Sequence, residues 1–286
     1  MEKPFLKKAN VLIAAIFSLS ICVVGYYVSN QSQYKQRVAY ASSAQAKEEA
    51  ELNDLEKQIN EFYTNDNKEL LKEDSTLSEA AKLKSKVDNI KVSATDFQIK
   101  EESVPEEMKN IAKEKKVLAN DLVNISDKLH IQDQVEQLFT KKLPNWQKFE
   151  DTVVIKDELK NEEINDINEN LGFFSEDQWL ELVKSYLTSA SEQVQEINDI
   201  QQKLTKYQNE ELSYEQYLTL AEQIEQVRNP KQQDEFKKAA DELGERFGVS
   251  TDDIVAENAE GSTTADETTS SDEQGLPIEQ EETAAY

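Results

Sequence analysis

The sequence predicts an all-α protein, and three observations indicate this fold class. Apolar residues recur at helical spacing along most of the chain, charged residues make up 31% of it, and it contains only 6 Gly and 5 Pro in 286 residues. Long stretches with few Gly or Pro residues favour amphipathic helices that bury one face and expose the other. Ile99 and Val153–Ile155 are expected to be short extended links between helices.

The composition also excludes several classes of function. A net charge of −26 repels phosphate backbones, so no binding to nucleic acid is expected. One His and one Cys cannot form a zinc site, and no glycine-rich phosphate-binding motif occurs. We expect His130 at a helix end and the many carboxylates on solvated helix faces. The sequence therefore predicts no enzyme, no catalytic residue, no metal site and no cofactor.

The first element is the apolar segment Val11–Val28, which contains no charged residue. A bilayer core of about 30 Å is crossed by about 20 apolar residues in a helix, so this segment is predicted to be a single transmembrane helix. Lys3, Lys7 and Lys8 make residues 1–10 basic, which favours a cytoplasmic N-terminus. The chain beyond this helix is then extracellular, and the protein is expected in the cell membrane.

A cleaved signal peptide is the alternative interpretation of this segment. Ala39, Tyr40 and Ala41 form the small-x-small pattern of a cleavage site, and the mature chain would then begin at Ser42. A polar stretch, residues 29–37, separates the apolar segment from this site, whereas cleavage sites usually follow the apolar region closely. The sequence therefore favours the uncleaved anchor.

Residues 29–51 are predicted to form a juxtamembrane stalk, and residues 52–248 an extracellular helical domain. Clusters of Pro, Gly and Asn interrupt the helical pattern, so the helices are expected to fold back on one another as bundles rather than form one coiled coil. Roughly 200 residues suffice for one elongated domain or two three-helix modules, and the sequence leaves both open. The main apolar stripes are Leu52–Phe62, Met108–Leu129 and Trp179–Tyr207.

Local signals mark the helix starts and junctions of this domain. Capping boxes, in which a Ser and a Glu or Gln three residues later satisfy the first backbone N–H groups, are predicted at three helix starts. These pairs are Ser103 with Glu106, Ser175 with Gln178, and Ser213 with Gln216. Large aromatic residues near the expected junctions are predicted to close the ends of the bundle cores: Trp146, Phe173, Phe174 and Trp179.

The C-terminal segment, residues 249–286, is predicted to be a disordered acidic tail rich in Ser and Thr. It contains many acidic residues but neither Lys nor Arg. Such a composition cannot bury enough apolar surface to offset the entropy of ordering the chain.

The segment Phe62–Lys72, which reads FYTNDNKELLK, resembles a block in the mid-cell-anchored protein Z family. Members of this family are division-site markers of streptococci and related Gram-positive bacteria. The apolar segment also resembles the membrane helix of the family, through Ile21-Cys22-Val23 and Tyr26-Tyr27-Val28. The resemblance covers roughly residues 10–139 and weakens along the chain.

This resemblance implies a non-enzymatic membrane scaffold that helps to position the division ring from midcell and whose extracellular part contacts peptidoglycan. Family members bind the tubulin-like division protein FtsZ through a cytoplasmic region. Only residues 1–10 precede the predicted membrane helix here, so direct contact with FtsZ is not expected of this chain. The candidate residues for a wall-facing site are Phe62, Tyr63, Asn65, Asn67 and Lys68.

The same residues also have a structural interpretation. Phe62 and Tyr63 would close a helix against the bundle, Asn65 and Asn67 would form a turn, and Lys68 would be exposed to solvent. Two other functions fit the sequence: a helical adaptor that binds another envelope protein through its exposed helix faces, and a secreted helical factor.

Overall fold

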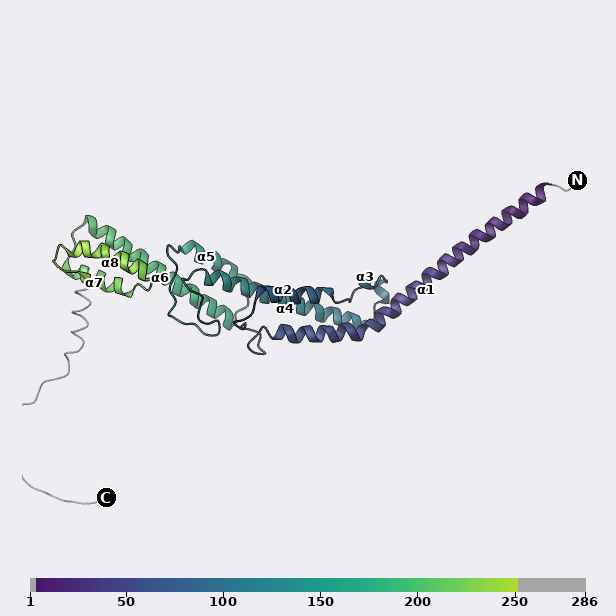
Figure 1. The fold of residues 1–286 in the computed structure, drawn as a ribbon, viewed down its shortest axis with the longest axis horizontal. Helices are drawn as coiled ribbons and strands as arrows, with labels where there is room; N and C mark the ends of the chain where they lie inside the picture. Colours follow the sequence, from purple (N-terminus) through teal and green to yellow (C-terminus); the bar gives the residue numbers. More distant parts are fainter. Residues whose placement is uncertain (1–3, 252–286) are drawn as a thin grey trace, which may run out of the picture. The chain divides into compact units, whose positions relative to one another are not determined.

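The computed structural model describes the backbone of residues 4–251 and the side chains of residues 28–251 (Figure 1). The secondary-structure elements of this part of the chain are all helices, which confirms the predicted all-α fold class. Its only strand-like pairings are two isolated antiparallel bridges, Tyr63 with Leu71 and Phe139 with Ile155. The second bridge confirms the extended link predicted at Val153–Ile155.

The chain divides into two compact units, residues 1–192 and 193–286, and the boundary falls inside helix α6. The first unit contains α1 (Pro4–Asn60), α2 (Leu77–Asn89), α3 (Ala94–Phe97), α4 (Glu106–Glu136), α5 (Asn161–Asn170) and the first part of α6 (Gln178–Asn209), with the 3-10 turns Glu101–Ser103 and Leu171–Phe173. The second unit contains the rest of α6, α7 (Tyr214–Gln226) and α8 (Pro230–Gly244).

Helices α1, α2 and α4 lie side by side and pack around one core in the first unit (Figure 1). Leu55, Val87 and Leu122 are almost completely buried in this core. The described part of the second unit has a core of its own, to which α6, α7 and α8 contribute Ile200, Tyr217 and Leu243. Each helix therefore buries one stripe, as the apolar spacing predicts.

The core of the first unit begins earlier than the apolar stripes indicate. Residues 29–51, predicted as a stalk, are part of α1, and Ala41 and Ala44 on this segment are buried. Glu48 is 5% exposed and accepts a hydrogen bond from the backbone N–H of Lys91 at 3.0 Å. Alanine and a paired glutamate do not stand out in a hydrophobic pattern, which is why the sequence places the start of the core at Leu52.

Two predictions concern the ends of the chain. No helix among the described residues is long and apolar enough to cross a membrane. The predicted transmembrane segment, residues 11–28, lies outside the described side chains except for Val28, and residues 252–286 of the predicted tail lie outside the described residues. The tail was predicted to begin at residue 249, but Thr251 is buried and donates hydrogen bonds to Asp241 from both its N–H and its hydroxyl at 2.8 Å.

The structure corrects two of the three predicted capping boxes. The pair Ser213 and Gln216 is confirmed, with both reciprocal hydrogen bonds present at the start of α7. Ser103 instead lies in a 3-10 turn and accepts a hydrogen bond from the Tyr34 hydroxyl at 2.7 Å. At the start of α6, the residue directly before the helix is Asp177 and not Ser175. The Asp177 carboxylate accepts a hydrogen bond from the backbone N–H of Leu180 at 2.8 Å.

The position predicted for His130 is wrong. His130 lies within α4, because the helix continues to Glu136. Its side chain is exposed. The apolar stripe that marks α4 in the sequence fades after Leu129, but the buried residues Ile131 and Val135 extend the packed part of the helix beyond that point. The sequence therefore places the end of this helix too early.

The aromatic residues near the junctions divide into buried and exposed members. Trp146 and Trp179 are 5% and 0% exposed, which confirms their predicted core role, and Phe174 packs against Trp179 with ring centroids 4.8 Å apart. Phe173 is 90% exposed, so its predicted place in a core is wrong. The neighbouring Leu171 takes the buried position of this 3-10 turn instead.

Candidate functional site

The segment Phe62–Lys72, called here the first turn, connects α1 to α2 and is closed by backbone hydrogen bonds. Tyr63 and Leu71 form the β-bridge. The N–H of Thr64 donates to the Leu70 carbonyl at 3.0 Å, and the N–H of Lys72 donates to the Phe62 carbonyl at 2.8 Å. These bonds satisfy the backbone groups beyond the end of α1 and fix the two ends of the turn together.

The five candidate residues occupy three different environments in this turn. Phe62 and Tyr63 are 7% and 3% exposed, as their structural interpretation predicts. Asn65 and Asn67 are exposed at the tip. Lys68 was expected to be exposed, but it is half-buried and has a left-handed backbone with φ of 57°. The five residues thus share one loop, but their side chains lie in different surroundings.

Lys68 is half-buried because it pairs with Asp121 of α4. Its Nζ lies 2.7 Å from Asp121 Oδ2, while the Tyr63 hydroxyl donates to Asp121 Oδ1 at 2.9 Å. Burial raises the pKa of Tyr63, and the negative charge of Asp121 raises it further. Tyr63 therefore remains a neutral hydrogen-bond donor, and the three side chains attach the first turn to α4.

The segment Leu138–Lys156, called here the second turn, repeats this backbone arrangement between α4 and α5. The N–H of Thr140 donates to the Val154 carbonyl, and the N–H of Lys156 donates to the Leu138 carbonyl, both at 2.9 Å. Each threonine hydroxyl also donates to the carbonyl that its own N–H contacts: Thr64 to Leu70 at 3.4 Å, and Thr140 to Val154 at 3.3 Å. The two turns are therefore copies of one local structure.

The sequence analysis missed this repeat because the tips differ in length. Residues 65–69 separate the matched threonine and bridge segments in the first turn, and residues 141–153 separate them in the second. The signal that could have revealed it is the pair of short blocks, Phe-Tyr-Thr with Leu-Leu-Lys and Leu-Phe-Thr with Val-Ile-Lys. Blocks of three residues with an insertion between them are easily overlooked in a helical sequence.

The longer tip of the second turn packs against its surroundings with aromatic residues. The rings of Trp146 and Phe149 lie 5.6 Å and 5.0 Å from the ring of Tyr186 on α6, in edge-to-face geometry. Trp146 Nε1 donates to Glu136 at 2.8 Å. The tip also contacts the first turn, because Gln147 Nε2 donates to the Leu71 carbonyl at 2.7 Å.

A buried lysine joins the first turn to the start of α6. Lys128 is 2% exposed, and its Nζ lies 2.7 Å from both the Glu69 carbonyl and Asp177 Oδ2. The same Nζ lies 5.0 Å from the centroid of the Trp179 ring, within the range of a cation–π interaction. A charge buried to this degree requires these partners, so Lys128 holds three segments of the first unit together.

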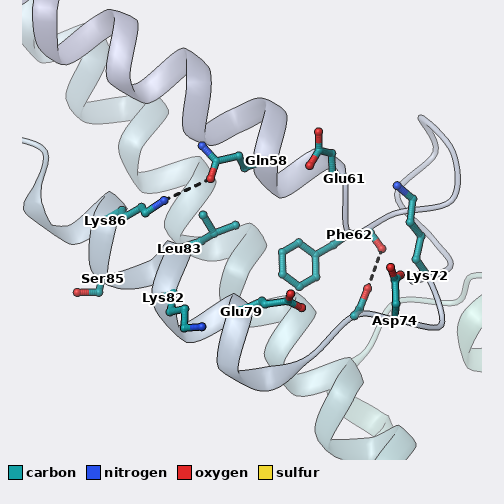
Figure 2. A pocket seen from close by; sticks show the side chains of 11 residues that line it. Gln58, Glu61, Phe62, Lys72, Asp74, Glu79, Lys82, Leu83, Ser85 and Lys86 are labelled. Atoms are coloured by element: carbon teal, nitrogen blue, oxygen red, sulfur yellow. Dashed lines mark hydrogen bonds between the residues drawn. The ribbon is translucent and has the colours of Figure 1, made fainter.

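A surface pocket of about 630 Å³ lies beside the first turn, between the end of α1 and α2 (Figure 2). Phe62 and Leu83 are the buried apolar residues of its lining. The remaining lining residues are polar or charged: Gln58, Glu61, Lys72, Asp74, Ser75, Glu79, Lys82, Ser85 and Lys86. The pocket thus combines a small apolar floor with a charged rim.

Charges of both signs are mixed along this rim. Figure 2 shows Glu61 and Asp74 on the Phe62 side of the pocket together with Lys72. It shows Lys82 beside Glu79, whereas Lys86 lies on the far side of Leu83. Lys86 donates to Gln58 Oε1 at 3.4 Å, and the hydroxyl of Thr76 donates to Glu79 at 2.8 Å. In the part of the chain that the structure describes, the side chains of Glu61, Asp74 and Lys82 form no hydrogen bond or ion pair. These groups are therefore available to a ligand.

The described residues contain no group of three or more His, Cys, Asp or Glu side chains that could hold a metal ion. The lining of the pocket offers ionic groups, one amide, two hydroxyls and one aromatic ring to a ligand. Comparisons of the chain with protein families, with curated proteins and with solved structures find no match to any of them.

Proposed function

We propose that this protein is a non-enzymatic, single-pass membrane protein whose extracellular helical bundles serve as a scaffold at the division site. In this role it helps to position the FtsZ ring. The observation that carries the division role is the resemblance of the first turn, Phe62–Lys72, to the mid-cell-anchored protein Z family. The charge-free segment, residues 11–28, supports the anchor.

The continuity of α1 supports this arrangement. The helix runs from Pro4 to Asn60, so the proposed anchor and the first bundle share one helix. Ala41, the first buried residue of the core, lies thirteen residues after Val28, which corresponds to about 20 Å along a helix. An anchor at residues 11–28 would therefore hold the bundle close to the outer membrane surface, where it can meet the cell wall.

The tip of the first turn is the proposed point of contact with peptidoglycan. Asn65 and Asn67 are exposed there, and each side-chain amide can both donate and accept hydrogen bonds to sugar hydroxyls or peptide groups. Phe62 and Tyr63 support the tip from the core, and Lys68 attaches it to α4. In this proposal the two asparagines contact the wall, and the other three candidates hold the turn in position.

The test is to image the full chain, tagged with a fluorescent protein at its N-terminus, in growing cells that lack their own copy. Rings at midcell that separate as new wall is inserted support the division role. A variant with Ile13→Arg and Ile16→Arg removes the anchor and should lose envelope fluorescence altogether. Uniform envelope fluorescence of the unaltered chain would contradict placement at the division site while leaving the anchor intact.

Wall contact has a separate test. The full chain in detergent micelles is mixed with purified sacculi and sedimented, beside a variant with Asn65→Ala and Asn67→Ala. We expect the unaltered chain in the pellet and the variant mainly in the supernatant. An unaltered chain that stays in the supernatant would exclude direct wall contact.

A helical adaptor is the second candidate function, and one observation favours it. Phe173 is 90% exposed, and a large aromatic side chain at the surface can anchor a contact with a partner. A photoreactive amino acid at this position should then cross-link to one envelope protein in cells. A cross-link that disappears when the same group is placed at the exposed Lys116 instead would support the adaptor.

A further inference from the structure

The ion pair of Lys128 and Asp177 combines a short contact with deep burial. Its lysine side chain is only 3% exposed, and its aspartate side chain is 18% exposed. The pair of Lys68 and Asp121 has the same separation of 2.7 Å, but its lysine side chain is 37% exposed. Burial makes charged groups costly, so the surroundings of Lys128 favour a reaction that removes both charges of its pair.

The two oxygens of the Asp177 carboxylate have different partners. Oδ2 lies 2.7 Å from Lys128 Nζ, so the nitrogen contacts an atom that is one covalent bond away from the carboxyl carbon. Oδ1 accepts a hydrogen bond from the backbone N–H of Leu180 at 2.8 Å, in the first turn of α6. This N–H and the positive end of the helix dipole would stabilise negative charge that develops on Oδ1 during an attack on the carbon.

The nitrogen of Lys128 is held in place by two further contacts. Nζ donates to the Glu69 carbonyl at 2.7 Å and lies 5.0 Å from the centroid of the Trp179 ring. Trp179 is 0% exposed, so water does not reach this side of the amine. Well-oriented reacting groups held together in this way can have effective concentrations of about 10⁵ M or more. The pair is therefore arranged as a nucleophile beside the carbon that it would attack.

We propose that Lys128 and Asp177 form an amide bond that covalently links α4 to the start of α6, and that the ion pair is the state from which this bond forms. One proton passes from Nζ to Oδ2, and the neutral amine then attacks the carboxyl carbon of Asp177. A second proton moves from the nitrogen to Oδ2, the bond between the carbon and Oδ2 breaks, and one water molecule leaves. The ammonium and the carboxylate thus become one neutral amide and one water, and the reaction needs no oxidant or reductant.

The product of this reaction has its hydrogen-bond partners already in place. The N–H that remains on Lys128 lies beside the Glu69 carbonyl, and Oδ1 of Asp177 keeps the N–H of Leu180. Both polar groups of the new amide are therefore satisfied, and two buried charges are removed. The chain contains one Cys, so it cannot form a disulfide within itself. The amide instead joins residues 49 positions apart and restricts the unfolded chain as a disulfide does.

The test is mass spectrometry of the full chain, purified in detergent micelles and then denatured. We expect an intact mass that is lower than the mass of the sequence by one water molecule. Trypsin does not cleave after a lysine whose side chain forms an amide, so digestion should yield residues 117–141 joined to residues 161–184. Fragment ions should place the link at Lys128 and Asp177. This inference does not depend on the division role, because the bond forms within the first unit.

Two variants test the assignment of the residues. Lys128→Arg keeps a positive charge that can pair with Asp177, but a guanidinium group stays protonated and is not a nucleophile. This variant should have the full mass of its sequence, yield separate tryptic peptides, and migrate more slowly than the unaltered chain in a denaturing gel. Lys68→Arg is the matched control, because it changes the lysine of the more exposed pair with Asp121 and should keep the link at Lys128.

Circular dichroism of both variants and of the unaltered chain establishes that their helices are folded. Complete tryptic cleavage after Lys128, together with the full mass of the sequence in the folded unaltered chain, would overturn the proposal. A linked peptide that persists in Lys128→Arg would overturn it as well. An equal amount of link between Lys68 and Asp121 would contradict the role of burial in the reaction.

Discussion

The first and second turns are closed by the same backbone hydrogen bonds but differ in the side chains beside them. Both close with a β-bridge, a threonine and a lysine whose N–H returns to the end of the preceding helix. The second turn fills its flank with Leu159 and the ion pair of Lys156 and Glu163, whereas the first turn leaves a pocket at that place. The comparison shows that backbone hydrogen bonds fix how the turn closes, while a few side chains determine whether a pocket lies beside it.

The largest expected effect concerns the attachment of the first turn to the rest of its unit. Lys128→Ala should destabilise the first unit by about 3–5 kcal/mol, because it leaves the Asp177 carboxylate without its buried partner. Urea denaturation followed by tryptophan fluorescence measures this loss, since both tryptophans of the chain, Trp146 and Trp179, lie in the first unit.

Lys116→Ala is the control for this prediction, because Lys116 is an exposed lysine on the same helix. We expect its unfolding midpoint to match that of the unaltered chain within error. A similar loss of stability in both variants would mean that the loss does not depend on the buried contacts of Lys128, and would contradict its role in joining the three segments.

The bridge residues should be equally important in the two turns. Leu71 and Ile155 are 0% and 1% exposed, so Leu71→Ala and Ile155→Ala should each cost about 2–5 kcal/mol through lost apolar contact and the cavity left behind. The same fluorescence measurement compares them. A loss confined to one variant would show that the two turns are not equivalent in the core.

Tyr63→Phe places in the first turn the residue that the second turn already has at Phe139. The change removes the hydrogen bond to Asp121 and should cost about 0.5–1.5 kcal/mol at neutral pH. Because the pKa of Tyr63 is raised in the folded protein, its contribution is fully present below the unfolded value of about 10 and is lost as the pH rises further. The unaltered chain should therefore lose stability above that pH more steeply than the variant, and parallel curves would contradict the role of Tyr63.

The smallest expected effect belongs to the ion pair of the second turn. The hydrogen bond from Lys156 lowers the pKa of Glu163, so its contribution is present above the ordinary value of 4.5 and is lost as the pH falls through the lowered value. Both side chains are more than one third exposed, so Glu163→Gln should cost less than about 1 kcal/mol at pH 7. NMR titration of the Glu163 carboxyl carbon measures the lowered pKa directly, and Lys156→Gln should return it toward the ordinary value.

Much of the fold follows from periodicity. The stripes of Leu52–Phe62 and Met108–Leu129 mark faces of α1 and α4 that are buried, because helical spacing and burial have the same physical origin. The segment at Ala41 was missed because small side chains bury little area and leave a weak pattern. The position of His130 was wrong because α4 continues beyond the strongest part of its stripe.

The candidate site was predictable only in part. Phe62 and Tyr63 mark the first turn in the sequence, and their burial could be anticipated from their place at the end of a stripe. Lys68 pairs with Asp121, which is 53 residues away along the chain, so no local pattern reveals that contact. The pocket likewise depends on α1 and α2 lying side by side, which brings Gln58 and Lys86 together.

The most direct test of the difference between the turns is a pair of double-mutant cycles measured by urea denaturation. One cycle combines Lys156→Gln with Glu163→Gln, and the other combines Lys72→Gln with Glu79→Gln. We predict a coupling free energy of about 0.3–1 kcal/mol for the second turn and none beyond error for the first. Equal coupling in the two cycles would mean that Lys72 and Glu79 are paired in solution, and would contradict an open pocket beside the first turn.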